Sequence, residues 1–202
     1  SAAGTVSAVT VIQDSFNRVG DLNGSMPDVG IVPWTTLVPA TQKVEDSVLK
    51  MIDGSAIETR ASLGFDFVPG LVYTLSVDID IDDGGDRSWM AIGFTNNLPE
   101  GIKAWGADIY PWALLRSEDQ NPTPGNPIPD DFATFLTDPY GARRQDVSLS
   151  PFANSGKVEI VLDTTDLNDY QVRFSFNDVP IRTVNYGSAP AITGVFVSAY
   201  KQ

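Results

Sequence analysis

Carboxylates are the side chains of this sequence best able to do chemistry. The 202 residues include 26 aspartates and glutamates but neither histidine nor cysteine. Histidine general bases, histidine-based zinc sites, serine-hydrolase triads and thiol chemistry are therefore excluded within this chain. Two carboxyl groups held roughly 5 to 10 Å apart can still hydrolyse a glycosidic bond. Catalysis by paired carboxylates therefore stays open.

A second set of polar side chains follows two predicted strands. In residues 73–81 and 170–176 large apolar residues occupy every second position, which is typical of strands with one dry face and one wet face. Asp78 and Asp80 fall on the wet side of the first strand, and Arg173 falls on the wet side of the second. This face could donate and accept hydrogen bonds to a ligand's hydroxyl groups. The alternative is a face that is merely solvated.

Large aromatic side chains gather between residues 89 and 116. Several lie in or beside predicted loops, where packing explains a large ring less readily, while Trp89 alternates with the small residues Ala91 and Gly93, which would leave room for a ligand. The alternative is core packing, because most tryptophans of a domain this size are buried. The candidates for ligand contact are Trp89, Trp105, Tyr110, Trp112 and Arg116.

These side chains must be positioned by a largely β structure. Residues 73–81 and 89–94 flank an acidic, glycine-rich stretch, which predicts an antiparallel pair at the centre of a sheet. Residues 47–52 and 56–63 flank Asp53 and Gly54, which predicts a second hairpin, although a helix over 44–52 fits the pattern too.

The remaining segments complete an all-β prediction. Four prolines in residues 121–129 favour a long surface excursion over about 117–145, with a turn of helix near 131–136. Strands are expected at 5–12, 157–163, 170–176 and 191–200, with a turn at Asn177 and Asp178. Frequent turn signals and almost no helix predict one domain over residues 1–202, an antiparallel two-sheet β-sandwich.

The charge balance restricts the partners of this chain. A formal charge of −13 argues against binding nucleic acid, because phosphates would be repelled. No apolar run approaches the roughly 20 residues that cross a bilayer, so membrane insertion is not expected.

Six short motifs along the chain form a familiar combination. They are DSFNR at 14–18, LNG at 22–24, VYTLSV at 72–77, WMAIGF at 89–94, PWALLR at 111–116 and VRFSFN at 172–177. Together they resemble the concanavalin A-like lectin and glucanase jelly rolls, in particular the LamG-like modules of exported bacterial proteins. The resemblance spans nearly the whole chain and rests on strand-core patterns, which are more specific for fold than for activity.

This resemblance implies a carbohydrate-binding jelly roll, secreted or at the cell surface, that can be one domain of a larger secreted protein. The Glu-x-Asp-x-x-Glu strand of laminarinase-type members is absent, and the Gln-x-His strand of alginate-lyase jelly rolls needs a histidine that this chain lacks. The expected function is therefore non-catalytic binding of a polysaccharide. A structural or adhesive domain without sugar affinity is the first alternative, and a glycoside hydrolase is the second.

The resemblance also implies a structural calcium ion. Calcium takes six to eight oxygen ligands, largely carboxylates and carbonyls from loops. Aspartates in two loop regions could supply them, although each could equally serve local turn hydrogen bonding. The candidates are Asp14, Asp21 and Asp28 near the start and Asp163, Asp166 and Asp169 near the end.

Overall fold

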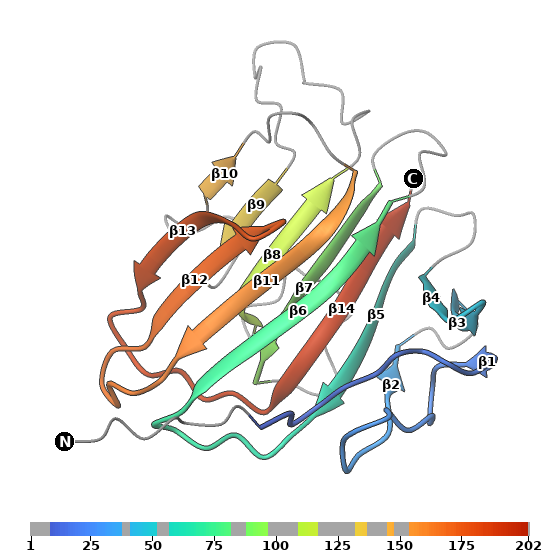
Figure 1. The fold of residues 1–202 in the computed structure, drawn as a ribbon, viewed down its shortest axis with the longest axis horizontal. Coiled ribbons are helices and arrows are strands. Elements are labelled where there is room, and N and C mark those ends of the chain that lie inside the picture. Colours follow the sequence, from blue (N-terminus) through green and yellow to red (C-terminus); the bar gives the residue numbers. More distant parts are fainter. Residues whose placement is uncertain are drawn as a thin grey trace.

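The computed structural model describes residues 9–37, 41–51, 57–81, 88–96, 109–116, 132–136, 145–147 and 154–201. Residues 57, 58, 109, 110, 146 and 201 are described by their backbone alone. The described residues form fourteen β-strands arranged in three sheets (Figure 1). Within these ranges no helix has the length and apolar character needed to span a membrane.

The largest sheet has seven strands, and every neighbouring pair is antiparallel. In spatial order its strands are β10 (Gln145–Val147), β9 (Phe132–Phe135), β8 (Ile109–Arg116), β7 (Trp89–Thr95), β14 (Gly194–Lys201), β5 (Ile57–Gly64) and β2 (Thr35–Thr36).

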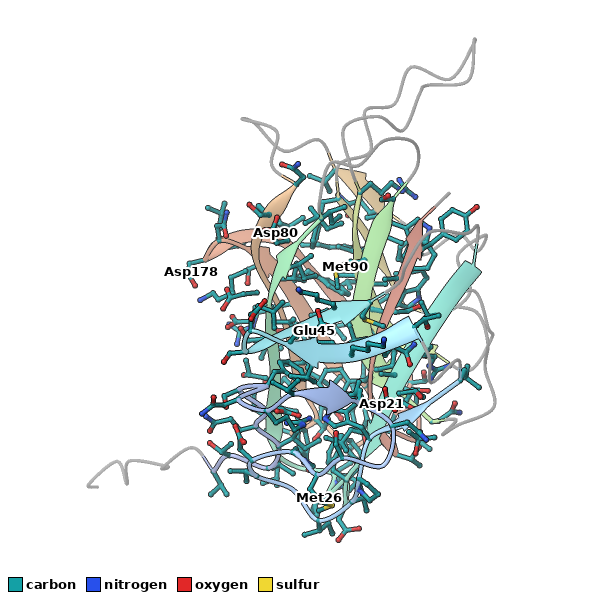
Figure 2. The ribbon with its side chains drawn as sticks, turned by 90° about the vertical axis from the view of Figure 1, so that its right-hand side faces the viewer. Asp21, Met26, Glu45, Asp80, Met90 and Asp178 are labelled. Atoms are coloured by element: carbon teal, nitrogen blue, oxygen red, sulfur yellow. The ribbon has the colours of Figure 1, made fainter. Side chains whose placement is uncertain are left out.

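A four-stranded antiparallel sheet lies over it, and a small three-stranded sheet sits at one side (Figure 1). The four strands are β13 (Val179–Asn185), β12 (Gln171–Phe176), β11 (Ser155–Asp163) and β6 (Val72–Asp80). The three are β1 (Gly20–Asp21), β3 (Gln42–Glu45) and β4 (Val48–Met51). Figure 2 shows β3 and β4 running across the side of the two larger sheets.

The main hydrophobic core lies between the two larger sheets. Alternate residues of β6, β11 and β12 point inward, including Ile79, Ile160 and Phe174, and they pack in one cluster with Ile92 and Leu115 of the seven-stranded sheet. In Figure 2 Met90 lies between the sheets, whereas Asp80 and Asp178 lie at the outer side of the smaller one. The predicted β-sandwich is confirmed.

The predicted pairing of residues 73–81 with 89–94 is wrong. Both segments are strands, but β6 pairs with β11 at the edge of the four-stranded sheet, and β7 pairs with β8 and β14 in the other sheet. The burial patterns agree with this separation. β6 alternates between exposed and buried residues, as expected of an edge strand with one solvated face, whereas nearly every residue of β7 is buried, as expected of a central strand with neighbours on both sides.

The predicted hairpin around Asp53 and Gly54 is also wrong. β4 pairs with β3, and β5 pairs with β14 and β2, so the two strands that flank this dipeptide belong to different sheets. The hairpin turn instead occupies Asp46 and Ser47, whose φ angles of 54° and 60° match the two-residue turn that twisted antiparallel strands favour. The alternative helix over 44–52 is wrong as well.

Two smaller predictions changed, and a third is largely untested. Residues 9–12 of the predicted first strand form no strand, and residues 5–8 lie outside the described ranges. The predicted helical turn near 131–136 is strand β9, all four residues of which are buried. Most of the predicted excursion at 117–145 lies outside the described residues.

The C-terminal half follows its prediction closely. Strands β11, β12 and β14 match, and the turn at Asn177 and Asp178 has φ angles of 48° and 63°. Strand β13 was missed, because Pro180 interrupts a segment whose burial does not alternate cleanly.

Gly93 allows a close approach that any larger residue would prevent. A Cβ atom there would lie 2.4 Å from Cβ of Trp112 and 2.7 Å from the carbonyl oxygen of Pro111. Because backbone cannot yield easily, we expect Gly93→Ala to lower the free energy of unfolding by about 1–3 kcal/mol. Urea denaturation measures this loss, and Ser76→Ala on the exposed face of β6 is the control, with a change below about 0.5 kcal/mol. Equal stability of the two variants would contradict the packing described.

Candidate functional site

The outer face of the seven-stranded sheet, which points away from the four-stranded sheet, carries a second hydrophobic cluster. All of the cluster's described members come from this one sheet, and none comes from the other two. They are Trp89, Ala91, Trp112, Leu114, Ala133, Phe135 and Phe196, with Tyr200 packed against them. Three of the predicted ligand-binding residues, Trp89, Trp112 and Arg116, therefore share one face, because they alternate with the core residues of β7 and β8.

One row of this face crosses three neighbouring strands and places an arginine beside two aromatic residues. Trp89 of β7 pairs with Arg116 of β8 on one side and with Tyr200 of β14 on the other. The rings of Trp89 and Tyr200 stack with their centroids 5.8 Å apart and their planes at 17°. Tyr200 is half-buried, whereas Trp89 and Arg116 are 6% and 8% exposed. We call Tyr200, Trp89 and Arg116 the aromatic–arginine row.

A second row, four residues farther along each strand, is fully enclosed. Phe196, Gly93, Trp112 and Phe135 are register partners on four adjacent strands. The ring of Trp112 stacks on that of Phe135 with centroids 3.7 Å apart, and neither side chain is exposed. Trp112 and Phe196 also fill the space over Gly93. The sequence suggested that Gly93 would leave room for a ligand, but this space is filled. Trp112 is a packing residue.

Arg60 of β5 is the second arginine on this face. Its guanidinium carbon lies 4.9 Å from the ring centroid of Phe196, and its Nη2 donates a hydrogen bond to Oγ1 of Thr95 at 3.1 Å. The described side chains of the face thus include two arginines and no carboxylate. Glu58 and Asp146 lie at outward register positions, but their side chains are outside the described set.

The other predicted ligand residues are not part of this face. Asp78, Asp80 and Arg173 are exposed on the outer face of the four-stranded sheet, on the opposite side of the molecule from the aromatic–arginine row. Trp105 and the side chain of Tyr110 lie outside the described residues. The structure therefore separates the polar candidates from the aromatic ones.

The carboxylate of Asp14 organises the N-terminal loop. It accepts hydrogen bonds from Nη1 and Nη2 of Arg18 and from Nε1 of Trp34, each at 2.7 Å, and from the backbone N–H of Phe16 at 2.9 Å. The side chain of Asp14 is 3% exposed. This carboxylate raises the pKa of the Arg18 guanidinium, through hydrogen bonding first and charge second.

The other predicted calcium ligands serve turns or face solvent. Asp21 is exposed in β1. Hydrogen bonds from the hydroxyl and backbone N–H of Ser15 hold the pKa of Asp28 below its ordinary value, and the same groups of Thr165 do so for Asp163.

Hydrogen bonds also occupy the last two candidates. Asp166 accepts a hydrogen bond from the backbone N–H of Asn168 at 2.9 Å, and Asp169 accepts one from Gly187 N–H at 2.6 Å. Across the described ranges no three acidic side chains gather as a metal site. Asp163 and Asp166 show the local turn bonding that the sequence left as the alternative. Asp14, Asp28 and Asp169 accept hydrogen bonds from residues 13 to 20 positions away along the chain.

Sequence reasoning missed Tyr200, Arg60 and Phe196. All three lie on strands whose positions were predicted, but only the pairing of β5 with β14 and of β14 with β7 brings them onto the face that carries Trp89. The available signal was the alternation of Phe196, Ser198 and Tyr200 within one predicted strand, which assigns them to a common face.

Comparison with known proteins identifies the fold. No family model matches the sequence, and no curated protein sequence matches it. Among solved structures, the potassium-bound Emp46p carbohydrate recognition domain has a TM-score of 0.50 at 10% identity, covering 83% of this chain and 80% of that one. A point mutant of the same domain has a TM-score of 0.50 at 11% identity, covering 93% and 90%.

A human SPRY domain has a TM-score of 0.48 at 9% identity, covering 79% of this chain and 93% of that one. Identities this low are informative about architecture and not about activity. The sheet order, the two-layer core and the match to the Emp46p domain agree, and the chain therefore has the concanavalin A-like jelly-roll fold.

Proposed function

We propose that this protein binds carbohydrate, without catalysing a reaction, through the outer face of its seven-stranded sheet. The observation that carries the proposal is the aromatic–arginine row. It places two stacked rings and a guanidinium on three adjacent strands of a rigid sheet.

The chemistry of this row suits a sugar. Aromatic rings pack against the apolar C–H faces of sugar rings, and a polar group beside them fixes orientation. The planar guanidinium of Arg116 supplies the polar group of this row. Tyr200 is the most exposed described aromatic residue of the face, and we assign it the first contact with the ligand.

The similarity to the Emp46p domain supports the same ligand class, because that domain is described as a carbohydrate recognition domain. A non-catalytic role is supported by the described charged side chains of the face, which are two arginines and include no carboxylate. Hydrolysis of a glycosidic bond requires two carboxyl groups across the scissile bond. A secreted or cell-surface location and a polysaccharide ligand are part of this proposal.

Calcium is not part of the proposed binding step, because within the described ranges the candidate aspartates do not gather as a metal site. A glycan array of oligosaccharides and polysaccharides tests both the binding and its independence of calcium. The array is probed with the full chain, once with added calcium and once with a chelator. We expect binding to at least one glycan class and the same pattern under both conditions. The absence of binding to every glycan would contradict the proposal and favour a structural or adhesive role.

A further inference from the structure

The N-terminal segment exposes aliphatic side chains to an unusual degree. Val9, Val19 and Ile31 are 82%, 84% and 74% exposed, and Val11, Met26 and Val29 are at least 40% exposed. Single exposed aliphatic residues are ordinary, so only those that lie together in space indicate an interaction surface.

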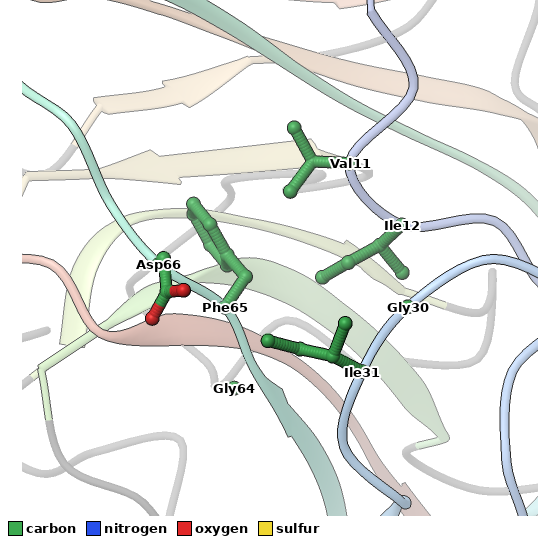
Figure 3. Close-up of a pocket in the computed structure, with 7 residues that line it drawn as sticks. All are labelled: Val11, Ile12, Gly30, Ile31, Gly64, Phe65 and Asp66. Carbon is green, nitrogen blue, oxygen red and sulfur yellow. The ribbon is translucent and has the colours of Figure 1, made fainter.

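Part of this segment forms one wall of a cavity of about 120 Å³ (Figure 3). Two hydrogen bonds of 3.0 Å between the backbones of Gln13 and Val29 hold the two limbs of the segment side by side. This bridge places Val11 and Ile12 beside Ile31, and in Figure 3 the three side chains face Phe65 on the chain that leaves β5.

The opposite wall is anchored in the sandwich. The backbone N–H of Phe65 donates to the carbonyl oxygen of Thr193 at 3.1 Å, and its ring lies 5.6 Å from that of Tyr73 and 6.4 Å from that of Phe67. Gly30 is required on the first wall, because its φ of +145° and the 2.7 Å approach of Pro27 Cγ exclude a side chain. The cavity is therefore built by local hydrogen bonds and packing.

One charged residue, Asp66, is among the seven that line the cavity. Asp66 is exposed, follows Phe65 directly and lies at the edge of the apolar walls in Figure 3. The cavity thus offers an apolar pocket with a carboxylate at its rim, on a chain whose formal charge is −13. An aliphatic group with a neighbouring positive charge complements both features.

We propose that this cavity docks a partner polypeptide that presents an aliphatic side chain beside a lysine or arginine. The aliphatic side chain lies between Ile12, Ile31 and Phe65, and the basic group pairs with Asp66. This surface is separate from the aromatic–arginine row and independent of sugar binding.

Two other occupants fit less well. A second copy of this chain would bring another charge of −13 and meet electrostatic repulsion. Residues 1–8 of the chain contain one larger aliphatic residue, Val6, but no lysine or arginine to pair with Asp66. The acidic rim therefore favours a basic partner over either.

The experiment titrates the isotope-labelled full chain with the blocked tetrapeptide Ser-Leu-Lys-Ser and follows NMR shifts of Ile12, Ile31 and Phe65. We expect saturable shifts at these residues, and at least threefold weaker binding for the peptides Ser-Leu-Glu-Ser and Ser-Ser-Lys-Ser. Asp66→Asn should weaken Ser-Leu-Lys-Ser binding about two- to fivefold at low salt, as for an exposed ion pair. Ile31→Ser should weaken it about tenfold through lost apolar contact.

Matched controls are Asp80→Asn and Val179→Ser, which remove an exposed charge and an exposed aliphatic group elsewhere and should change nothing. The proposal is overturned if millimolar Ser-Leu-Lys-Ser causes no shifts at the cavity, if the Glu peptide binds equally well, or if the control variants lose as much affinity as Asp66→Asn and Ile31→Ser. Glycan binding should be unchanged in Ile31→Ser, so this result is independent of the sugar proposal.

Discussion

Trp112→Ala is expected to lower the free energy of unfolding by about 3–5 kcal/mol, a typical cost of emptying a fully buried tryptophan site. The side chain of Trp112 has no exposed surface and stacks directly on Phe135. Its Cβ also closes the space over Gly93, so the neighbouring backbone cannot move in to fill the cavity without distorting β7.

Urea denaturation measures this loss, with Trp112→Phe as the matched control. Phenylalanine retains a ring that can stack on Phe135, so its cost should be clearly smaller than that of alanine. A loss below about 1 kcal/mol for Trp112→Ala would contradict the packing role and return Trp112 to the candidate ligand residues.

Asp14→Ala is expected to lower the free energy of unfolding by about 2–4 kcal/mol, because it leaves a partly buried guanidinium and an indole N–H without their acceptor. The carboxylate accepts four hydrogen bonds from Phe16, Arg18 and Trp34, which fix the path of the chain before β2. Phe16 has a φ of 53°, a conformation that a residue of this type rarely adopts, and the hydrogen bond from its N–H to Asp14 helps to hold it there.

The same variant separates a hydrogen-bonding role from a metal-binding role. We expect the stability difference between Asp14→Ala and the wild type to be the same with calcium and with a chelator. A difference that disappears in the chelator would show that Asp14 acts through a metal ion. Asp80→Ala, on the exposed face of β6, is the control and should stay within about 0.5 kcal/mol of the wild type.

The strands were more predictable from sequence than their pairing. In β6, β11 and β12 one face is wet, so the period-two pattern is clear and the segments were predicted within one or two residues. Sheet membership depends on contacts between residues far apart in the chain. The short connection between β6 and β7 favoured a hairpin, but β7 pairs with β8 and β14 in the centre of the other sheet.

The candidate site was likewise predictable in its local residues but not in their long-range partners. Trp89, Trp112 and Arg116 were predicted as ligand residues from their types and local spacing, and the fold does place them on one face. Their separate roles follow from long-range pairing. Trp112 meets Phe135 and is enclosed, whereas Trp89 meets Tyr200, which was not predicted, at a row that keeps some exposure. Among the calcium candidates, local turn bonding accounts for Asp163 and Asp166, whereas Asp14, Asp28 and Asp169 also depend on hydrogen bonds from distant parts of the chain.

A binding titration at Tyr200 tests the central claim most directly. With the best ligand from the glycan array, isothermal calorimetry compares the wild type, Tyr200→Ala and the control Asp80→Asn. Loss of the accessible ring from the aromatic–arginine row should weaken binding at least about tenfold, or about 1.4 kcal/mol, whereas Asp80→Asn should bind like the wild type. Unchanged affinity of Tyr200→Ala, or loss of binding in Asp80→Asn, would show that the sugar binds elsewhere on the molecule.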